Sequence, residues 1–237
     1  MQYKFAENKS YEDFSSGRVL YHKTGNANFP ARLASEIFSR CLSYLNGSAK
    51  RVSVYDPCCG AGYLLAVLGF LFNGRIASLS GSDADVEAVS LARKNLSLLA
   101  ERGMSNRKEE LKNFFEAYGK ESHALAVESA ENLSRLIKNE ISCEVFQRDI
   151  IKNSNSDFKA DVVITDVPYG NLIELPGGIP FDIEAMLENL FYNLNSESVV
   201  AVVSGNRQKF SNEKFIRLEK FIAGKRKIEI LKLKPRG

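Results

Sequence analysis

One stretch constrains the fold of this 237-residue chain more than any other. The apolar run VSVY, which begins at Val52, breaks into the loop DPCCGAGY, and a second apolar run continues from Tyr63 to Phe72. The first run has the length of a strand and the second has the length of a helix. Glycines after a buried strand let the chain turn into a helix and let a ligand approach the backbone. The stretch therefore predicts a strand, a binding loop and a helix.

The segments that follow repeat this alternation. A short apolar stretch around Ile76 to Ser80 leads to Asp83, and residues 84–100 have helical periodicity. Further strands are predicted at Cys143–Phe146, Asp161–Thr165, Val199–Val203 and Ile228–Leu233, and helices at Phe181–Leu194 and Asn212–Ala223. This order predicts an α/β protein of the Rossmann-like class, with a doubly wound, mostly parallel sheet.

Two segments fall outside the simple alternation. Residues 1–50 contain a helical pattern that starts near Pro30, and we expect this N-terminal segment to pack on the main domain, residues 51–237. Residues 101–140 are mostly helical and are longer than a minimal connection requires. Their 7 bases and 8 acids make them a poor phosphate-binding patch. We interpret them as a helical insertion that covers the sheet edge or shapes a cleft.

Charge is distributed unevenly along the chain. Lys and Arg outnumber acids by 7 to 4 in residues 1–50 and by 11 to 3 in residues 206–237, whereas acids lead by 22 to 14 between them. Basic ends suit a polyanionic partner such as RNA, although a solvated lysine-rich surface would give the same composition. The candidate RNA contacts are Arg32, Arg207, Lys209 and Lys225.

Cysteine and hydropathy patterns exclude several classes of protein. The four cysteines form no CxxC pair and there are only two histidines. The sequence therefore indicates no zinc or other metal site and no disulfide framework. The longest apolar run, Tyr63–Phe72, is about half of what a membrane span needs. We expect a cytoplasmic protein with reduced thiols.

Acids at successive strand ends indicate the ligand of the binding loop. Asp56 can hold an ammonium group, and the helix N-terminus after Gly60 and Gly62 can receive a carboxylate. Asp83 can accept both hydroxyls of a ribose, and Asp149 can accept an adenine amino group. Amino acid, ribose and adenine together match S-adenosylmethionine. The loop residue Cys58 is a further candidate for this pocket, and the apolar Leu65, where a dinucleotide loop has a third glycine, disfavours a nicotinamide dehydrogenase.

A second motif lies at the end of the fourth predicted strand. Asp166-Val167-Pro168-Tyr169 resembles the Asp/Asn-Pro-Pro-Tyr/Phe signature of methyltransferases that act on base or amide nitrogens, with Val167 in place of the first proline. A carboxylate there can accept an N–H group and orient the nitrogen toward a methyl donor, and Tyr169 can stack on a flipped base. Asp166, Pro168 and Tyr169 are the candidate catalytic residues, and Asp166 also borders the predicted cofactor pocket.

A narrower likeness extends over residues 18–205. The segments FPARLASEIF (29–38), YDPCCGAGYLLAVLG (55–69), KNLSLLA (94–100) and ITDVPYG (164–170) resemble the AviRa family of avilamycin-resistance 23S ribosomal RNA guanine methyltransferases. The resemblance implies S-adenosylmethionine as the methyl donor and a guanine of 23S rRNA, or of the large ribosomal subunit, as the acceptor. It favours N1 over N2 of that guanine. Beyond Val203 the likeness fades and only one strand is evident, which leaves the usual antiparallel end of the sheet in doubt.

Other functions share parts of these patterns. An N2-guanine tRNA methyltransferase has a similar Asp-x-Pro-Tyr motif. An N6-adenine DNA methyltransferase usually needs a target-recognition domain for which this chain has no room, and a protein-glutamine methyltransferase would prefer Asn at position 166. A non-catalytic RNA-binding module would have no need of the Asp166–Tyr169 motif.

Overall fold

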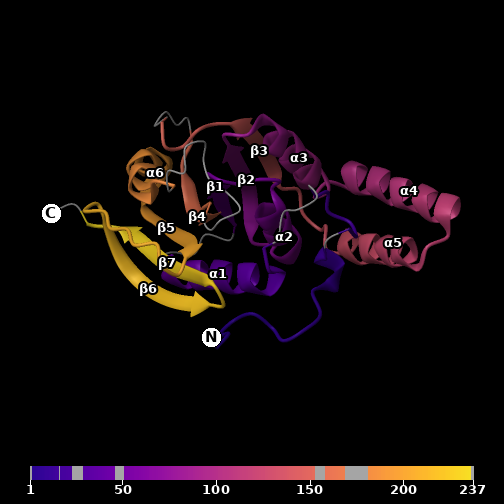
Figure 1. Cartoon of the computed structure of the whole chain (residues 1–237), viewed down its shortest axis with the longest axis horizontal. Coiled ribbons are helices and arrows are strands. Elements are labelled where there is room, and N and C mark those ends of the chain that lie inside the picture. The colour runs from indigo at the N-terminus through magenta and orange to yellow at the C-terminus, as the bar shows by residue number, and fades with distance from the viewer. Residues whose placement is uncertain are drawn as a thin grey trace.

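A computed structural model of the chain describes residues 2–15, 17–22, 29–45, 51–152, 158–168 and 181–235. These residues contain a seven-stranded sheet in the order β3-β2-β1-β4-β5-β7-β6 (Figure 1). Neighbouring strands from β3 to β5 are parallel, whereas β7 is antiparallel to both β5 and β6. The strands are β1 Val52–Asp56, β2 Ile76–Asp83, β3 Ser142–Gln147, β4 Ala160–Asp166, β5 Leu194–Gly205, β6 Phe215–Ala223 and β7 Arg226–Leu233. The predicted Rossmann-like fold with a mostly parallel sheet is confirmed.

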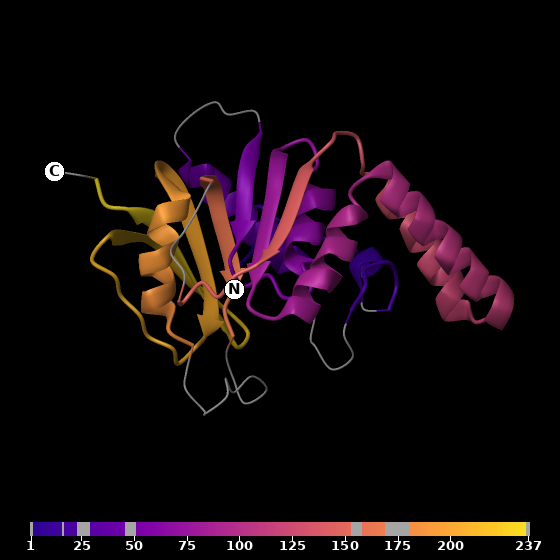
Figure 2. The same cartoon turned by 90° about the horizontal axis from the view of Figure 1, so that it is seen from above.

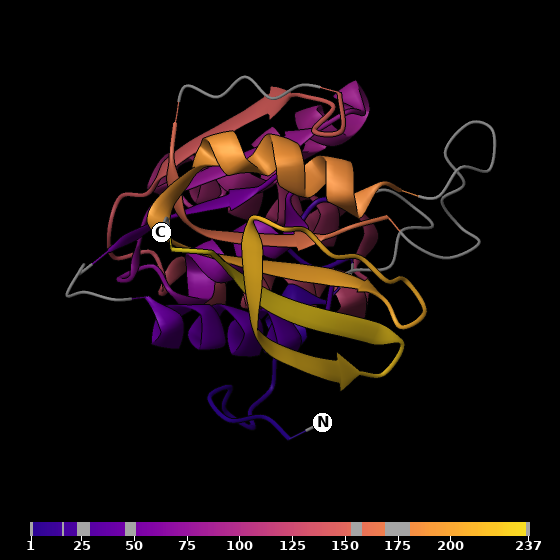
Figure 3. The ribbon, with the colours of Figure 1, turned by 90° about the vertical axis from the view of Figure 1, so that its left-hand side faces the viewer.

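Helices cover both faces of the sheet, and Figure 3 shows α1 and α6 on opposite sides of the strands. The covering helices are α1 Ala31–Tyr44, α2 Tyr63–Leu71, α3 Val86–Ser97 and α6 Ile183–Leu190. Side chains of a strand alternate between the two faces, so β4 contributes Val162 and Ile164 to one core and Val163 to the other. The first core includes buried residues of α1, α2 and α3, and the second includes those of α6. Burial on both faces explains why the central strands are continuous apolar runs.

The helical insertion forms a hairpin that projects from the body of the molecule (Figures 1 and 2). It consists of α4 Glu101–Tyr118 and α5 Glu121–Ser134, which pack against each other. Gly119 ends α4 in the left-handed conformation, with φ 59°, which lets the chain reverse at once into α5. The hairpin also contacts the N-terminal segment, because α5 packs on the short 3₁₀ helix η1, Glu12–Phe14.

The end of the chain differs from the sequence prediction. The helix predicted at Asn212–Ala223 is wrong, because residues Phe215–Ala223 form strand β6. The sheet does have an antiparallel end, in which β6 and β7 are joined by a tight turn at Gly224, whose φ is 61°. A register shift between Arg217 and Glu219 explains the error. A bulge of this kind interrupts the two-residue alternation by which a strand is recognised in a sequence.

Candidate active site

The loop between β1 and α2 is held in a conformation that needs glycine at two positions. Gly60 and Gly62 have φ angles of 51° and 72°, in the left-handed region. A Cβ on Gly62 would lie 2.9 Å from the Cβ of Ala92 on α3, so the close approach of α2 to α3 excludes a larger residue. At Gly60, by contrast, no atom of the described residues other than its two chain neighbours lies within 4 Å of the position of a Cβ. The loop therefore leaves space beside its backbone at Gly60.

Asp56 ends β1 beneath this loop and is only 2% exposed. Burial raises the pKa of its carboxyl to about 8, and the negative charges of Asp83 and Asp166 add to the rise. The N–H of Cys58, 3.1 Å from Oδ1, and the hydroxyl of Thr165 work in the opposite direction. A buried carboxyl group with two acidic neighbours is a site that a cation would stabilise.

Asp83 and Asp149 lie at the ends of the next two strands. Oδ2 of Asp83 accepts the N–H of Gly60 at 2.8 Å, so this half-buried carboxylate ties the loop to β2. Asp149, which follows β3, accepts the N–H of Ile151 at 3.1 Å and pairs with Lys152 at 2.8 Å. Burial would raise the pKa of Asp149, but these two partners hold it below its usual value. Both acids lie at the carboxyl edge of the sheet, as the parallel strands require.

The residues of this edge fit S-adenosylmethionine. The open space at Gly60 gives a ligand access to the backbone, and the raised pKa of Asp56 indicates a place for an ammonium group. Asp83 and Asp149 place further carboxylate oxygens, which can accept hydrogen bonds, along the same edge. Burial also raises the pKa of Cys58 well above its usual value, so this half-buried residue contributes a neutral thiol. Among the described residues, no group of three or more His, Cys, Asp and Glu side chains could hold a metal ion.

The second motif lies beside the loop. Tyr55 of β1 aligns with Val163 of β4, so Asp166 extends two positions beyond Asp56 along the neighbouring strand. Val167 is buried, and its N–H donates to the carbonyl oxygen of Val203 at 3.0 Å, which continues the strand pairing through the motif. Pro168 is half-buried, and Tyr169 lies outside the described residues. Asp166 is thus fixed at the sheet edge next to the predicted cofactor pocket.

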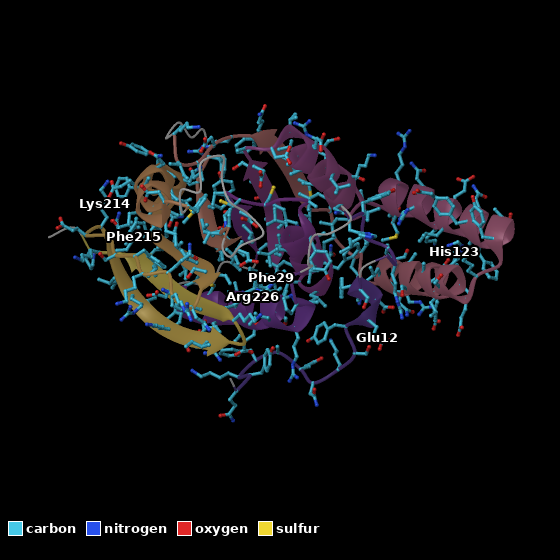
Figure 4. All side chains as sticks on the ribbon, in the orientation of Figure 1. Glu12, Phe29, His123, Lys214, Phe215 and Arg226 are labelled. Carbon is cyan, nitrogen blue, oxygen red and sulfur yellow. The ribbon has the colours of Figure 1, made fainter. Side chains whose placement is uncertain are left out.

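An arginine that the sequence did not single out reaches Asp166. Nε of Arg226, the first residue of β7, lies 3.9 Å from Oδ2 of Asp166. The Arg226 guanidinium carbon lies 5.2 Å from the centre of the Phe29 ring, and Figure 4 shows the two labelled side chains together. The tight turn at Gly224 brings Arg226 opposite Gly205 and so to the same edge as Asp166. The sequence Ala-Gly-Lys-Arg at residues 223–226 is typical of a hairpin turn, so Arg226 could have been predicted at this edge if β6 had been recognised as a strand.

Asn95 is another residue that the sequence did not identify. It is fully buried on α3, and its side-chain amide donates to the carbonyl oxygens of Ala61 and Tyr21, both at 2.8 Å. Its amide oxygen accepts the N–H of Tyr21 at 2.7 Å. One side chain therefore joins the glycine loop to the N-terminal segment. Asn was present in the KNLSLLA stretch, but helical periodicity gives no sign of such a bridge.

The four candidate RNA contacts divide into two groups. The first group is exposed and consists of Arg207, Lys209 and Lys225. Arg207 and Lys209 follow the end of β5, and Lys225 precedes β7, so all three lie at the edge of the sheet that carries Asp166. Arg32 is half-buried, and its guanidinium is held by the N-terminal segment, with a hydrogen bond to Asn8 at 3.0 Å and the ring of Tyr3 at 4.1 Å. Arg32 thus differs from the other three in being engaged by residues of the N-terminal segment.

A family model described as rRNA methyltransferase AviRa matches residues 1–226. The chain belongs to this family. A curated AviRa-type relative, the 23S rRNA (guanine(2535)-N(1))-methyltransferase of Streptomyces viridochromogenes, is 35% identical over 205 residues, which is 83% of this chain and 82% of the relative. The predicted family resemblance and the predicted class of enzyme, an rRNA methyltransferase, are confirmed.

Solved structures agree with this assignment. The 1.5 Å structure of the rRNA methyltransferase AviRa from Streptomyces viridochromogenes superposes with a TM-score of 0.87 at 32% identity, covering 98% of this chain and 96% of that one. TrmN from Thermus thermophilus has a TM-score of 0.53 at 14% identity, covering 89% of this chain and 51% of that one, and shares the fold alone. The AviRa likeness thus includes the N-terminal segment, the helical hairpin and the antiparallel end of the sheet.

No helix among the described residues has the length and apolar character needed to cross a membrane.

Proposed function

We propose that this protein transfers a methyl group from S-adenosylmethionine to N1 of a guanine in 23S ribosomal RNA. The observation that carries the proposal is the position of Asp166, which closes β4 beside the glycine loop in a chain 35% identical to a 23S rRNA (guanine-N1) methyltransferase. A carboxylate there faces the place where the methyl donor meets its acceptor in a sheet of this topology.

The cofactor would be held by residues from three strand ends. Asp56 pairs with the ammonium group, and the backbone at Gly60 and the start of α2 receives the carboxylate. Asp83 accepts the ribose hydroxyls while keeping the Gly60 N–H, since a carboxylate has several acceptor positions. Asp149 accepts the adenine amino group. When bound, S-adenosylmethionine supplies an electrophilic methyl group on a sulfonium.

Asp166 would act on the acceptor base. The N1–H of a neutral guanine must be lost before or during methylation, and a carboxylate within hydrogen-bond reach can take that proton. The same hydrogen bond orients N1 toward the methyl group, so proton removal and positioning come from one side chain. Tyr169 follows Pro168 directly and would stack on a base flipped out of the RNA.

The test is transfer of tritium from labelled S-adenosylmethionine to 23S rRNA, 16S rRNA, tRNA and duplex DNA, with nuclease mapping and mass spectrometry of the product. We expect label only in 23S rRNA, as 1-methylguanine. Asp166→Asn, which keeps the shape but cannot accept a proton, is expected to abolish transfer while cofactor affinity stays within about threefold. Label in tRNA or DNA, methylation at N2, or near-normal turnover by Asp166→Asn would each refute a stated part of the proposal.

A further inference from the structure

Arg226 combines three features that suggest a role in the reaction itself. Its side chain is 22% exposed and lies 3.9 Å from Asp166, at the sheet edge where the acceptor base would bind. Its Nε is buried and has no hydrogen-bond partner within the part of the chain that the structure describes. A buried guanidinium nitrogen without a partner is costly, because each of its N–H groups loses hydration when the side chain packs against protein.

The surroundings of Arg226 hold its side chain in place but leave its Nε without a hydrogen-bond partner among the described residues. The guanidinium carbon of Arg226 lies over the Phe29 ring, 5.2 Å from its centre, and the backbone of Arg226 is held in the β5–β7 pairing opposite Gly205. Phe29 is only 6% exposed, so the ring itself is fixed by the core. A cation–π contact of this kind orients the guanidinium plane but leaves its edge, which carries the N–H groups, for other partners.

Methylation at N1 creates a need for such a donor. When N1 of guanine loses its proton, the negative charge is shared between N1 and the carbonyl oxygen O6 of the same ring. Donors that face the atom where charge develops are a large source of catalysis, and they work best when the protein holds them in place beforehand. Asp166 cannot fill this role, because it is the acceptor of the N1 proton and has no hydrogen-bond donor of its own to offer to O6.

We propose that Arg226 is a catalytic residue that donates to O6 of the target guanine as Asp166 takes the N1 proton; this inference rests on the function proposed above. The N1–H proton passes to the Asp166 carboxylate, and the N1 lone pair forms the bond to the methyl carbon. The bond between that carbon and the sulfonium sulfur breaks, and its electron pair stays on the sulfur, which becomes a neutral thioether. The charge on O6 then disappears, and Asp166 releases the proton to water.

The assignment also accounts for the choice of nitrogen. Methylation at N2, the exocyclic amine, does not require charge to build up on O6, so a fixed cation at that oxygen would gain little there. Methylation at N1 does require it. A guanidinium of Arg226 at O6 would therefore assist the proposed N1 methylation and contribute little to methylation at N2.

The test uses the full chain with 23S rRNA in single-turnover reactions over a range of pH, and calorimetry of cofactor binding. Arg226→Gln is expected to slow methyl transfer by about 100- to 1,000-fold near pH 7, the loss seen when one such donor is removed, with cofactor affinity within about threefold. The deficit is expected to shrink as the pH rises, because solvent hydroxide then ionises N1 without help. Lys220→Gln is the matched control, since it removes an exposed cation from the same β6–β7 hairpin and is expected to leave the rate unchanged.

Each outcome decides between the two proposals. If the wild-type product is 1-methylguanine and Arg226→Gln slows transfer less than threefold, or equally at every pH, the role of Arg226 is wrong while the function stands. If the wild type yields N2-methylguanine or no labelled 23S rRNA, the proposed function itself fails. Should Arg226→Gln not fold, Arg226→Lys keeps the charge over Phe29 but loses the planar fork, and a smaller loss with the same pH trend is expected.

Discussion

Asp56 is a carboxyl group in a place that disfavours its charge. Its pKa of about 8 means that it is mostly protonated at pH 7 in the free protein, mainly because of burial. Since this pKa lies above the value of the unfolded chain, ionisation of Asp56 costs stability progressively as the pH rises from about 4 to about 8. A protein keeps such a group where a ligand compensates for it, and the ammonium of an amino acid would do so.

The first prediction is that cofactor binding releases a proton from Asp56. A bound ammonium lowers the pKa of the carboxyl, so at pH 7 the complex should release about one proton. Calorimetry in two buffers of different ionisation enthalpy measures this number directly. Asp56→Asn is expected to bind the cofactor weakly and to release none. Identical heats in both buffers for the wild type would remove Asp56 from the ammonium site.

The second prediction concerns Asp83, which holds the loop and is the proposed partner of the ribose. Asp83→Ala removes the acceptor of the Gly60 N–H and the proposed ribose partner, so cofactor binding should weaken by about 1 to 3 kcal/mol. The neighbouring acid Asp85 is the matched control, because its side chain caps α3 by accepting the N–H of Glu87. Asp85→Ala should lower stability by about 1 kcal/mol but leave cofactor affinity within a few fold. Equal affinities for Asp83→Ala and wild type would exclude Asp83 from the pocket.

The acids of the site that were found from the sequence share one property, which is position at a strand end. Asp56, Asp83 and Asp166 were identified because acids after buried runs converge at one edge of a parallel sheet. Arg226 and Asn95 were missed because they reach the site through tertiary structure. The position of Arg226 at the site depends on a hairpin whose first strand has a bulge. The role of Asn95 depends on a contact between segments more than 70 residues apart.

At the scale of elements, the central strands were predictable and the C-terminal hairpin was not. Strands β1, β4 and β5 are buried on both faces, so their apolar runs stand out from the sequence around them. In the edge strand β6 only Phe215 is buried, the other residues being exposed or half-buried, and three of its apolar residues, Phe215, Leu218 and Ile222, recur at spacings of three and four. That spacing is typical of a helix. Only the pairing with β7 decides between the two structures.

The N-terminal segment is attached to the fold by one buried carboxylate. Glu36 of α1 is fully buried and accepts the backbone N–H groups of Lys4, Phe5 and Ala6 at 2.8 to 2.9 Å. Arg40, one turn later, pairs with Glu36 and also with Glu219 of β6. Burial would raise the pKa of Glu36, but these hydrogen bonds hold it below its usual value. One carboxylate thus connects the start of the chain, α1 and the C-terminal hairpin.

The third prediction is that Glu36→Gln destabilises the protein by about 3 to 5 kcal/mol at pH 7, the cost of removing one partner of a buried pair. Because the pKa of Glu36 is lowered by folding, its contribution is present above the pKa of the unfolded chain and is lost as the pH falls through the folded value. The difference in unfolding free energy between wild type and variant should therefore decrease toward acid pH in urea denaturation. Glu7→Gln, which alters an exposed pair with Lys9, should leave the urea midpoint unchanged. A constant difference from neutral to acid pH would contradict the assignment.

The helical hairpin also holds the N-terminal segment. Arg107 of α4 donates to the carbonyl oxygen of Val19 at 2.8 Å and lies 4.3 Å from the centre of the Tyr21 ring. The hydroxyl of Tyr21 donates to Glu110 at 3.0 Å, and Asn95 fixes the backbone of Tyr21 to the glycine loop. The insertion therefore has a structural role next to the cofactor loop, which its near-neutral composition could not indicate.

For the molecule as a whole, acids and cations meet at the carboxyl edge of the sheet. The carboxyl edge combines the acids of the cofactor site with Arg207, Lys209, Lys225 and Arg226, all from the basic last segment of the chain. The antiparallel end of the sheet makes this possible, because β7 runs back and brings its first residues to the ends of β4 and β5. An enzyme that draws one base of a polyanion into an acidic pocket needs cations around it to bind the backbone.

The final prediction tests whether those cations bind RNA. Replacing Arg207, Lys209 and Lys225 together by Gln should weaken rRNA binding and make the slope of log affinity against log salt less steep by about two to three, since each lost phosphate contact removes a little under one unit. The control removes three exposed cations from the opposite edge, Arg75, Lys138 and Lys159, which precede β2, β3 and β4. Fluorescence anisotropy with a labelled 23S rRNA fragment measures both slopes. If the two triple variants flatten the slope equally, binding follows net charge and the carboxyl edge is not the RNA-binding face; if only the first does, the RNA backbone contacts the edge that holds Asp166.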